Sequence, residues 1–463
     1  MTTEPWQMEG VEVARLIRAG KISAAEVVES QLARIDQVNG RLNAIVRRAD
    51  DEARAIAHAI DDGSIDGSNV GMTMTSKVNT DHAGHPNDNG IRALAQNPSP
   101  RTTPCIEGML ESGMVMVGRT NTPALSMRFH TDNALHGETL NPHGAHITAG
   151  GSSGGAGSAV AAGLCHVAQG NDVGGSVRWP AHCNGIIGLR PTMGRMVTGG
   201  TNPNPRGWAA ANMATQGPLA RTMADLRATW TAMNKPNWAD PFWSPVPLEF
   251  PRPNGPIKVA LVTEDPLGLD PVVVDTVRKA GRLLADAGYE VEEVAPPMLE
   301  ELFTLWATIG SVDMLLGLVP MLPMIDDEGL TEVFEDWKSN FPPPTGETFM
   351  RAHMLRDMMI RAWNGFFEQH PLVVLPGYAA PYMRRAQDRE GPGSMEKAAR
   401  DARYMLNIPA IAIPAMSFPI GSHDGAPIGV QLAAHMWRED LILDAGDALE
   451  ERLGKVSPVD PVW

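Results

Sequence analysis

Three serines and one lysine are the residues of this chain whose types and spacing could do chemistry. Ser152 and Ser153 lie between two glycine pairs, and Ser176 follows another glycine pair 24 residues after Ser152. Lys77 lies upstream in TMTSKVN, among mostly apolar or small neutral residues. A lysine in such surroundings can lose its proton, because desolvation disfavours the ammonium form. A neutral lysine can then act as general base for a serine nucleophile.

The first glycine–serine segment, ITAGGSSGGAGSAVAAGL (147–164), admits three interpretations. A nucleotide-binding P-loop would need a lysine after its glycines, and none follows. A nucleophile elbow, G-x-S-x-G, fits Gly151, Ser153 and Gly155, but any glycine–serine cluster supplies that match, and no later histidine has a recognisable setting. The third interpretation is a backbone cradle that leads into a helix of small residues, which can press closely against a sheet.

The second segment, GNDVGGSVRWPAHCNGIIGLRPTMGR (170–195), repeats the pattern of a glycine pair before a serine. A small-residue helix and a short apolar run join the two loops, so the loops can fold back beside each other. Taken singly, Lys77 would be a surface lysine and Ser176 a turn serine. A catalytic role for Lys77 and Ser176 is therefore predicted only because the lysine and the two glycine–serine loops occur together.

The joint pattern resembles the amidase signature family of serine hydrolases. The resemblance runs from the N-terminal helices nearly to the end of the chain. The segments that carry it are TSKVN, VGRTNTPALS (117–126), AGGSSGGAGSAVAAGL, NDVGGSVRWPAHCNGIIGLRPTMGR, QGPLARTMADL (216–226), NIPAIAIPAM (407–416) and GAPIGVQLAA (425–434).

This resemblance implies a Ser–cis-Ser–Lys triad and no cofactor. On this chain the nucleophile would be Ser176, the bridging serine Ser152, held after a cis peptide, and the base Lys77. Lys77 would take a proton from Ser152 while Ser152 takes one from Ser176. The oxyanion hole would consist of the backbone N–H groups of Val173, Gly174, Gly175 and Ser176.

Supporting roles are predicted for the neighbours of these residues. Gly151 and Ser153 are expected to shape the first loop, with Ser153 bonding to loop backbone. Asp172 and Arg178 are expected to form an ion pair that shapes the nucleophile loop. Cys183 is interpreted as a packed thiol rather than a second nucleophile.

Three histidines, His136, His143 and His146, cluster on a loop rich in glycine and proline. A metal site would need a compact ligand set with a carboxylate or thiolate partner. We therefore expect loop or pocket-rim histidines and no metal.

The chain differs from the usual sequence of the family at several positions. The residue after the lysine is often Asp and here is Val78, and Ala149 stands where proline is common. Trp179 lies beside the nucleophile loop, and the loop TDHAGHPNDNGI (80–91) is unusually polar. These changes leave the triad intact but affect the prediction of the substrate.

The elements that must position these residues alternate between strands and helices, which predicts an α/β fold. The resemblance implies the amidase signature fold, a large mixed β-sheet core flanked by α-helices on both sides. Residues 7–60 are predicted to be helical, with a capping box of Ser23 and Glu26. Further helices are predicted at 270–288 and 439–454. Strands are predicted at 71–78, 114–120, 257–262, 290–294, 372–377, 411–415 and 429–434.

We expect one domain over residues 1–463, with N-terminal helices (1–60) and a signature core (61–230). Methionine, leucine and aromatic residues crowd short helical stretches between residues 298 and 367. Such side chains fill irregular apolar space and adapt to varied ligands. The stretch is either ordinary core or a set of helices that line a substrate pocket.

Composition excludes several classes of partner. The net charge of −16 argues against a nucleic-acid or anionic-membrane partner. Three sparse cysteines supply no disulfide framework. The N-terminus does not resemble a secretory signal, and the apolar run 314–325 is too short, with two prolines, for a spanning helix. A cytoplasmic monomer or homodimer is the default expectation.

The predicted function is hydrolysis of the C–N bond of a small hydrophobic or aryl amide. Carbamates (urethanes) and esters are plausible extensions, because an acyl-enzyme needs only a carbonyl and a departing amine or alcohol. Two alternatives stay open: the glutaminase subunit of a tRNA-dependent amidotransferase, and a non-enzymatic glycine-rich binding module.

Overall fold

The computed structural model describes residues 4–198, 206–252, 255–461 and 463. Within these residues, strands that lie far apart in the chain join one sheet of eleven strands. In chain order they are β1 (Ile45–Arg48), β2 (Thr73–Lys77), β3 (Val115–Thr120), β4 (Val167–Asp172), β5 (Ile187–Arg190), β6 (Thr215–Ala220), β7 (Lys258–Leu261), β8 (Glu290–Glu293), β9 (Leu372–Pro376), β10 (Ala415–His423) and β11 (Ala426–Ala434).

The sheet is mixed, as the sequence predicts. Its strand order is β1-β3-β2-β4-β6-β5-β10-β11-β9-β7-β8. Strand β2 runs parallel to both β3 and β4, whereas β4 and β6 are antiparallel. The long hairpin of β10 and β11 is also antiparallel and lies between β5 and β9.

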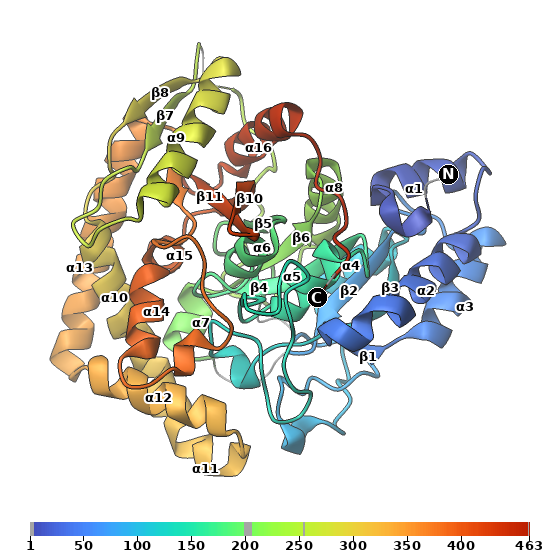
Figure 1. Cartoon of the computed structure of the whole chain (residues 1–463), viewed down its shortest axis with the longest axis horizontal. Helices are drawn as coiled ribbons and strands as arrows, with labels where there is room; N and C mark the ends of the chain where they lie inside the picture. Colours follow the sequence, from blue (N-terminus) through green and yellow to red (C-terminus); the bar gives the residue numbers. More distant parts are fainter. Residues whose placement is uncertain (1–3, 199–205, 253–254, 462) are drawn as a thin grey trace.

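Helices cover both faces and both ends of the sheet (Figure 1). The first three, coloured blue, lie beside β1 and β3 at one end of the sheet, and α10 to α13 lie at the other end. The helices are α1 (Gly10–Arg18), α2 (Ala24–Leu42), α3 (Asp50–Asp61), α4 (Pro104–Glu111), α5 (Gly154–Ala161), α6 (Arg178–Asn184), α7 (Trp208–Asn212), α8 (Met223–Met233), α9 (Pro271–Asp286), α10 (Leu299–Val312), α11 (Leu322–Ile325), α12 (Glu328–Asn340), α13 (Gly346–Gln369), α14 (Ser394–Asp401), α15 (Arg403–Ala410) and α16 (Glu439–Leu453).

Most sequence-predicted elements are confirmed. Six of the seven predicted strands correspond to β2, β3, β7, β8, β9 and β11, and the helices at 270–288 and 439–454 are α9 and α16. The capping box also forms, because the Ser23 side chain accepts from the backbone of Glu26 and the Glu26 side chain accepts from the backbone of Ser23.

Two predictions of secondary structure are wrong. Residues 411–414 form a turn after α15, where Ala412 has φ +64°, and the strand begins only at Ala415. The segment 7–60 is not helical throughout, because Asn43 ends α2 with φ +50° and the chain then enters β1. Both errors come from residues in the left-handed region, which redirect the chain within a step or two.

Helix α5 is the predicted helix of small residues, and all eight of its residues are buried. It lies in the connection between β3 and β4, and it packs tightly because its glycines allow close approach. A Cβ on Gly155 would lie 2.4 Å from the backbone nitrogen of Asn121, which is nearer than atoms can come. The sequence from 154 to 161 therefore has almost no freedom to enlarge its side chains.

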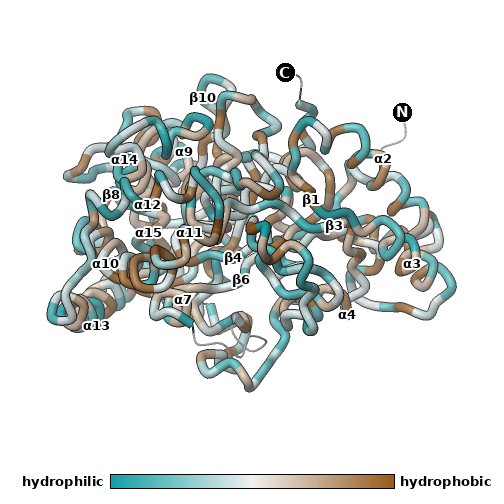
Figure 2. The backbone as a smooth tube through the Cα atoms, turned by 90° about the horizontal axis from the view of Figure 1, so that it is seen from below, coloured by the Kyte–Doolittle hydropathy of each residue, from teal (hydrophilic) through white to brown (hydrophobic). Residues whose placement is uncertain are grey.

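The methionine-rich region, residues 298–367, forms the helices α10 to α13. One stretch there, Leu299–Ile325, is long and apolar enough to span a membrane by composition alone, and 44% of its most apolar window is buried. It consists of α10, a π-helical turn (Asp313–Leu318), a short 3-10 turn and α11. In Figure 2, hydrophobic and hydrophilic residues alternate along helices such as α9 and α13, as expected where one side covers a core.

Candidate active site

Strands β2 and β4 bring Lys77 beside the second glycine–serine loop. The two strands are parallel neighbours, with Met74 opposite Val167 and Thr75 opposite Ala168. Lys77 is the last residue of β2, and β4 ends at Asp172, immediately before the loop that carries Ser176. Because the carboxyl ends of parallel strands meet at one edge of a sheet, two segments 90 residues apart deliver their polar residues to the same place.

Lys77 is fully buried and is held by two side chains. Its Nζ lies 2.7 Å from Oγ of Ser152 and donates to Oδ1 of Asn171 at 2.9 Å. Burial lowers the pKa of Lys77 well below its usual value, and the negative charge of Asp172 offsets this only in part. A neutral amine at this position can accept a proton from the Ser152 hydroxyl.

Ser152 follows a cis peptide bond with Gly151, as the resemblance implies. A Cβ on Gly151 would lie 2.2 Å from the carbonyl oxygen of Arg128, so only glycine fits there. The neighbouring Ser153 differs from its prediction. Its Oγ has no hydrogen-bond partner in the described residues, and its backbone N–H donates instead to the carbonyl oxygen of Ser176 at 3.3 Å. Close packing explains the difference, because a Cβ on Gly170 would lie 2.9 Å from the Ser153 hydroxyl.

Ser176 lies in the turn between β4 and α6 and is partly exposed. The backbone N–H groups of Val173, Gly174 and Ser176 have no acceptor among the described residues. The N–H of Gly175, predicted as a further oxyanion donor, donates to Oδ1 of Asp172 at 2.9 Å. Three of the four predicted donors are therefore free to receive a ligand in this structure.

The predicted ion pair of Asp172 and Arg178 is present and fully buried. The guanidinium binds both carboxylate oxygens at 3.0 Å, and Arg190, which the sequence analysis missed, adds a third contact at 3.3 Å. Burial alone would raise the pKa of Asp172, but the two guanidiniums outweigh it and lower the pKa to about 2. The carboxylate also accepts from the backbone of Val177, so it holds the nucleophile loop at several points.

A cavity of about 330 Å³ opens above these groups. Ser152, Ser176 and Gly174 form its polar floor, and its walls are mostly apolar. The apolar wall residues come from the loop at 125–129, from the methionine-rich region (298–367) and from α15: Leu125, Phe129, Trp306, Met314, Trp337 and Leu406. Part of the segment 298–367 therefore lines this cavity, and its role as a substrate pocket stays a prediction.

Besides Arg190, three residues near Lys77 had no predicted role: Asn79, Ser126 and Asn171. Asn171 contacts Lys77 and exchanges hydrogen bonds with Asn79, which in turn donates to Oγ of Ser126 at 2.9 Å. All three lie within the quoted signature segments or directly beside Lys77, so their proximity to the motif was the available signal. Trp306 was also unassigned, and its Nε1 donates to the carbonyl oxygen of Val173 at 3.1 Å.

The remaining residues singled out by the sequence do not join the site. His136 contacts Asp88, His143 contacts the backbone of Asn184, and His146 packs on Tyr382, so these histidines do not converge. Cys183 is buried among apolar groups, and burial raises the pKa of its thiol well above the usual value.

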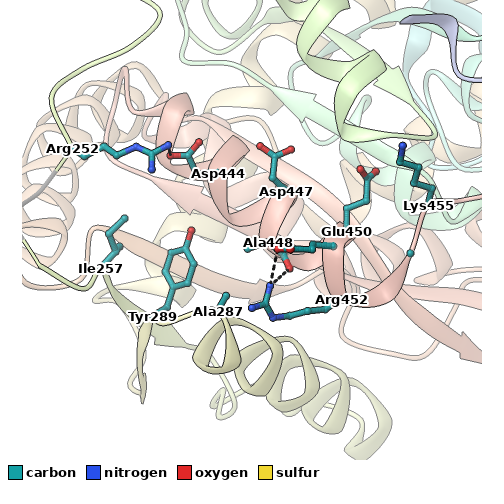
Figure 3. Close-up of a pocket in the computed structure, with 12 residues that line it drawn as sticks. Arg252, Ile257, Ala287, Tyr289, Asp444, Asp447, Ala448, Glu450, Arg452 and Lys455 are labelled. Atoms are coloured by element: carbon teal, nitrogen blue, oxygen red, sulfur yellow. Dashed lines mark hydrogen bonds and ion pairs between the residues drawn. The ribbon is translucent and has the colours of Figure 1, made fainter. Parts of the chain in front are cut away.

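A second, larger hollow of about 740 Å³ lies on the outer surface between α9 and α16 (Figure 3). Its lining is largely charged and includes Asp444, Asp447, Glu450, Arg452 and Lys455, with Asp444 paired to Arg252. It includes none of the predicted catalytic residues, whereas Ser152 and Ser176 line the smaller, mostly apolar cavity and Lys77 is buried behind Ser152.

Comparisons with known proteins agree with this arrangement. Residues 26–443 match the family Amidase. The chain is 39% identical to an indoleacetamide hydrolase of Bradyrhizobium diazoefficiens, over 97% of this chain and 87% of that protein. Among solved structures, it is similar to 6-aminohexanoate cyclic dimer hydrolase in complex with substrate (TM-score 0.85, 27% identity, 98% of each chain). It is also similar to a bacterial aryl acylamidase of the amidase signature family (TM-score 0.84, 26% identity, 96% of each chain).

A hydrolase of carbon–nitrogen bonds other than peptide bonds is the class that this fold and these similarities define. The chain belongs to the amidase family, as its signature segments predict. The non-enzymatic alternative is thereby set aside.

Proposed function

We propose that this amidase hydrolyses small hydrophobic or aryl amides through an acyl-enzyme on Ser176. The observation that carries the proposal is the buried contact of 2.7 Å between Lys77 Nζ and Ser152 Oγ, on the floor of a cavity that Ser176 also lines. An amine with a strongly lowered pKa beside a hydroxyl is the arrangement that a general base requires.

In the acylation step, neutral Lys77 takes the proton of the Ser152 hydroxyl while Ser152 takes that of Ser176. The Ser176 oxygen attacks the amide carbonyl and forms a tetrahedral intermediate. The free N–H groups of Gly174 and Ser176, with that of Val173, face the developing oxyanion in this proposal. Each such donor contributes about 3–4 kcal/mol to the stability of the transition state.

The relay then runs in reverse. The proton held by Lys77 returns through Ser152 to the nitrogen of the leaving amine, the C–N bond breaks, and the acyl group stays on Ser176. Water enters where the amine has left, gives its proton to the same relay and attacks the acyl carbonyl. The acid departs, and Ser176 regains its proton, so the enzyme ends in its starting state.

The cavity supports the choice of an apolar substrate. Trp306 and Trp337 line the same cavity as Ser152 and Ser176, and aromatic walls favour flat, apolar groups. The similarity to an indoleacetamide hydrolase also supports an arylacetamide as the substrate. Carbamates and esters with the same groups are included in the proposal, because the relay can protonate either a nitrogen or an oxygen leaving group.

A hydrolysis panel tests the proposal. Purified protein is assayed with indole-3-acetamide, an acetanilide, an aryl carbamate, an aryl ester and glutamine, and product acid and ammonia are measured. We expect the aryl amides to be hydrolysed fastest and glutamine to give no ammonia. Ammonia release from glutamine alone would instead support the glutaminase subunit.

Adjacent serines supply a matched control for the mechanism. Ser152→Ala and Ser176→Ala should each lower kcat by a factor of about 10³ or more, because the nucleophile and its relay act as one unit. Ser153→Ala removes a hydroxyl without a hydrogen-bond partner and should retain activity. Full activity in Ser176→Ala would contradict the mechanism. Loss of activity in Ser153→Ala would mean that any substitution in this loop disturbs its structure, so that the loss in Ser152→Ala could not be assigned to the proton relay.

A further inference from the structure

Two histidines and one glutamate converge at a point outside the apolar cavity. Glu52 lies in the first turn of α3, and His82 and His85 lie in the polar loop that follows β2. One imidazole nitrogen from each histidine and one carboxylate oxygen from Glu52 all lie within 4.8 Å of one another. In this group, Nε2 of His85 lies 3.1 Å from Oε2 of Glu52.

A tight turn places the two imidazoles on one face. The N–H of His85 donates to the carbonyl oxygen of His82 at 3.0 Å, and Gly84 has φ +81°, as a type II turn requires at its third residue. His82 and His85 pair across this turn as antiparallel neighbours, so their side chains point the same way. The rings stack with their centres 4.5 Å apart.

His82 has a ring nitrogen that the protein leaves unsatisfied. The residue is 5% exposed, and its buried Nδ1 has no hydrogen-bond partner among the described residues. Buried polar atoms nearly always have a partner, and a bound ion is one of the few explanations for an exception.

We propose that Glu52, His82 and His85 bind one zinc ion. Two imidazole nitrogens and a carboxylate oxygen are a ligand set that zinc takes readily, whereas calcium and magnesium prefer oxygen ligands alone. A tetrahedral zinc ion with bonds of about 2.0–2.1 Å separates its ligand atoms by about 3.3 Å. A modest contraction of the present group achieves this spacing. Water supplies the fourth ligand, because His85 and Glu52 are partly exposed.

Such an ion would join α3 to the loop that follows the lysine. His82 comes five residues after Lys77, and Arg119 already holds that segment through the carbonyl oxygens of Lys77 (2.9 Å) and Pro86 (2.6 Å). The three ligands do not line the cavity that holds the serines. The zinc ion is therefore structural, and it stabilises the folded state without taking part in the proposed reaction.

Calorimetric titration of the metal-free, full-length protein with zinc chloride tests this proposal, together with thermal denaturation. We expect one zinc ion per chain, a rise in Tm on zinc addition, and the visible absorption of a tetrahedral site when cobalt(II) replaces zinc. His85→Ala and Glu52→Gln should weaken binding by at least about tenfold and abolish the rise in Tm. Both positions are partly exposed, so either variant can be checked for folding by circular dichroism.

His423→Ala is the matched control, because His423, at the end of β10, is a partly exposed histidine beside the carboxylate of Asp424 and is not one of the three proposed ligands. It should bind zinc like the wild type. The proposal is overturned if the wild type binds no zinc stoichiometrically. It is equally overturned if His85→Ala and Glu52→Gln bind as tightly as the wild type, since the ion would then lie elsewhere. Neither result bears on the hydrolysis panel, which tests the serines.

Discussion

Replacement of Asp172 by asparagine tests how the nucleophile loop is held. The carboxylate is fully buried between the guanidiniums of Arg178 and Arg190, neither of which is exposed. Arg178 retains Gln431 and the carbonyl oxygen of Met405 as partners in the variant, but both cations lose Asp172, the one carboxylate that pairs with them in the described part of the chain. Breaking a buried ion pair by removal of one partner costs about 3–5 kcal/mol.

The lowered pKa of Asp172 gives a second estimate of how much its charge contributes to the free energy of unfolding. Its value falls from the usual 3.8 to about 2, which corresponds to about 2 kcal/mol of stability from ionisation of this group. Because the folded-state pKa is the lower one, this contribution is complete above about pH 5 and is lost as the pH falls toward 2. The wild type and Asp172→Asn should therefore differ by the same free energy at pH 7 and at pH 5.

Urea denaturation at these two pH values is the assay, and kcat is measured in parallel. We expect a loss of about 3–5 kcal/mol at both pH values. We also expect a fall in kcat, because the backbone N–H groups of Gly175 and Val177 lose a charged acceptor. Glu347→Gln, which removes an exposed ion pair with Arg351, is the control and should leave stability unchanged. A loss below about 1 kcal/mol, or one that shrinks between pH 7 and pH 5, would refute the reasoning.

Three further predictions concern the base, the small helix and the cavity wall. The pH profile of kcat/KM should rise through a pKa well below that of a free lysine and then level, because only neutral Lys77 accepts a proton; a profile still rising at about pH 10 would contradict this role. Gly155→Ala should lower the free energy of unfolding by about 1–3 kcal/mol, since its Cβ would meet backbone that cannot move; an unchanged denaturation midpoint would contradict the close packing. Asn171→Ala should shift that pH profile and lower kcat more than Asn79→Ala does, because of these two asparagines only Asn171 contacts the Lys77 amine. Equal effects of the two variants would mean that both act by disturbing the local structure.

The sequence predicts the fold well where local pattern and sheet position agree. Strands β7, β9 and β11 are apolar runs bounded by turns, and they form where expected. Strands β4 and β6 were missed because VAQGND and TQGPLA contain glycine, asparagine or proline, which are poor strand formers. They are strands because their neighbours in the sheet supply hydrogen bonds, and a single sequence does not contain that information.

In the candidate site, too, the sequence predicts the residues that belong to local motifs but not the contacts made between distant strands. Lys77, Ser152 and Ser176 follow from the glycine-rich segments and their resemblance to a family, and the ion pair of Asp172 with Arg178 follows from charges six residues apart. The second cation, Arg190, reaches Asp172 from a different strand, and local spacing does not indicate it. The Ser153 hydroxyl was wrongly expected to bond, because the sequence does not reveal how little space surrounds it.

The hydrogen bond from Trp306 to the carbonyl oxygen of Val173 joins the cavity wall to the turn that carries Ser176, so we expect substrate fit and catalytic rate to be coupled. Trp306 belongs to the cavity wall, whereas Val173 begins the turn whose backbone N–H groups are proposed to receive the oxyanion. An acyl group that displaces the indole also disturbs that turn, even if it is bound strongly by the rest of the cavity. Poor substrates should therefore differ from good ones in kcat more than in KM, and tight-binding but slowly turned-over amides should act as inhibitors.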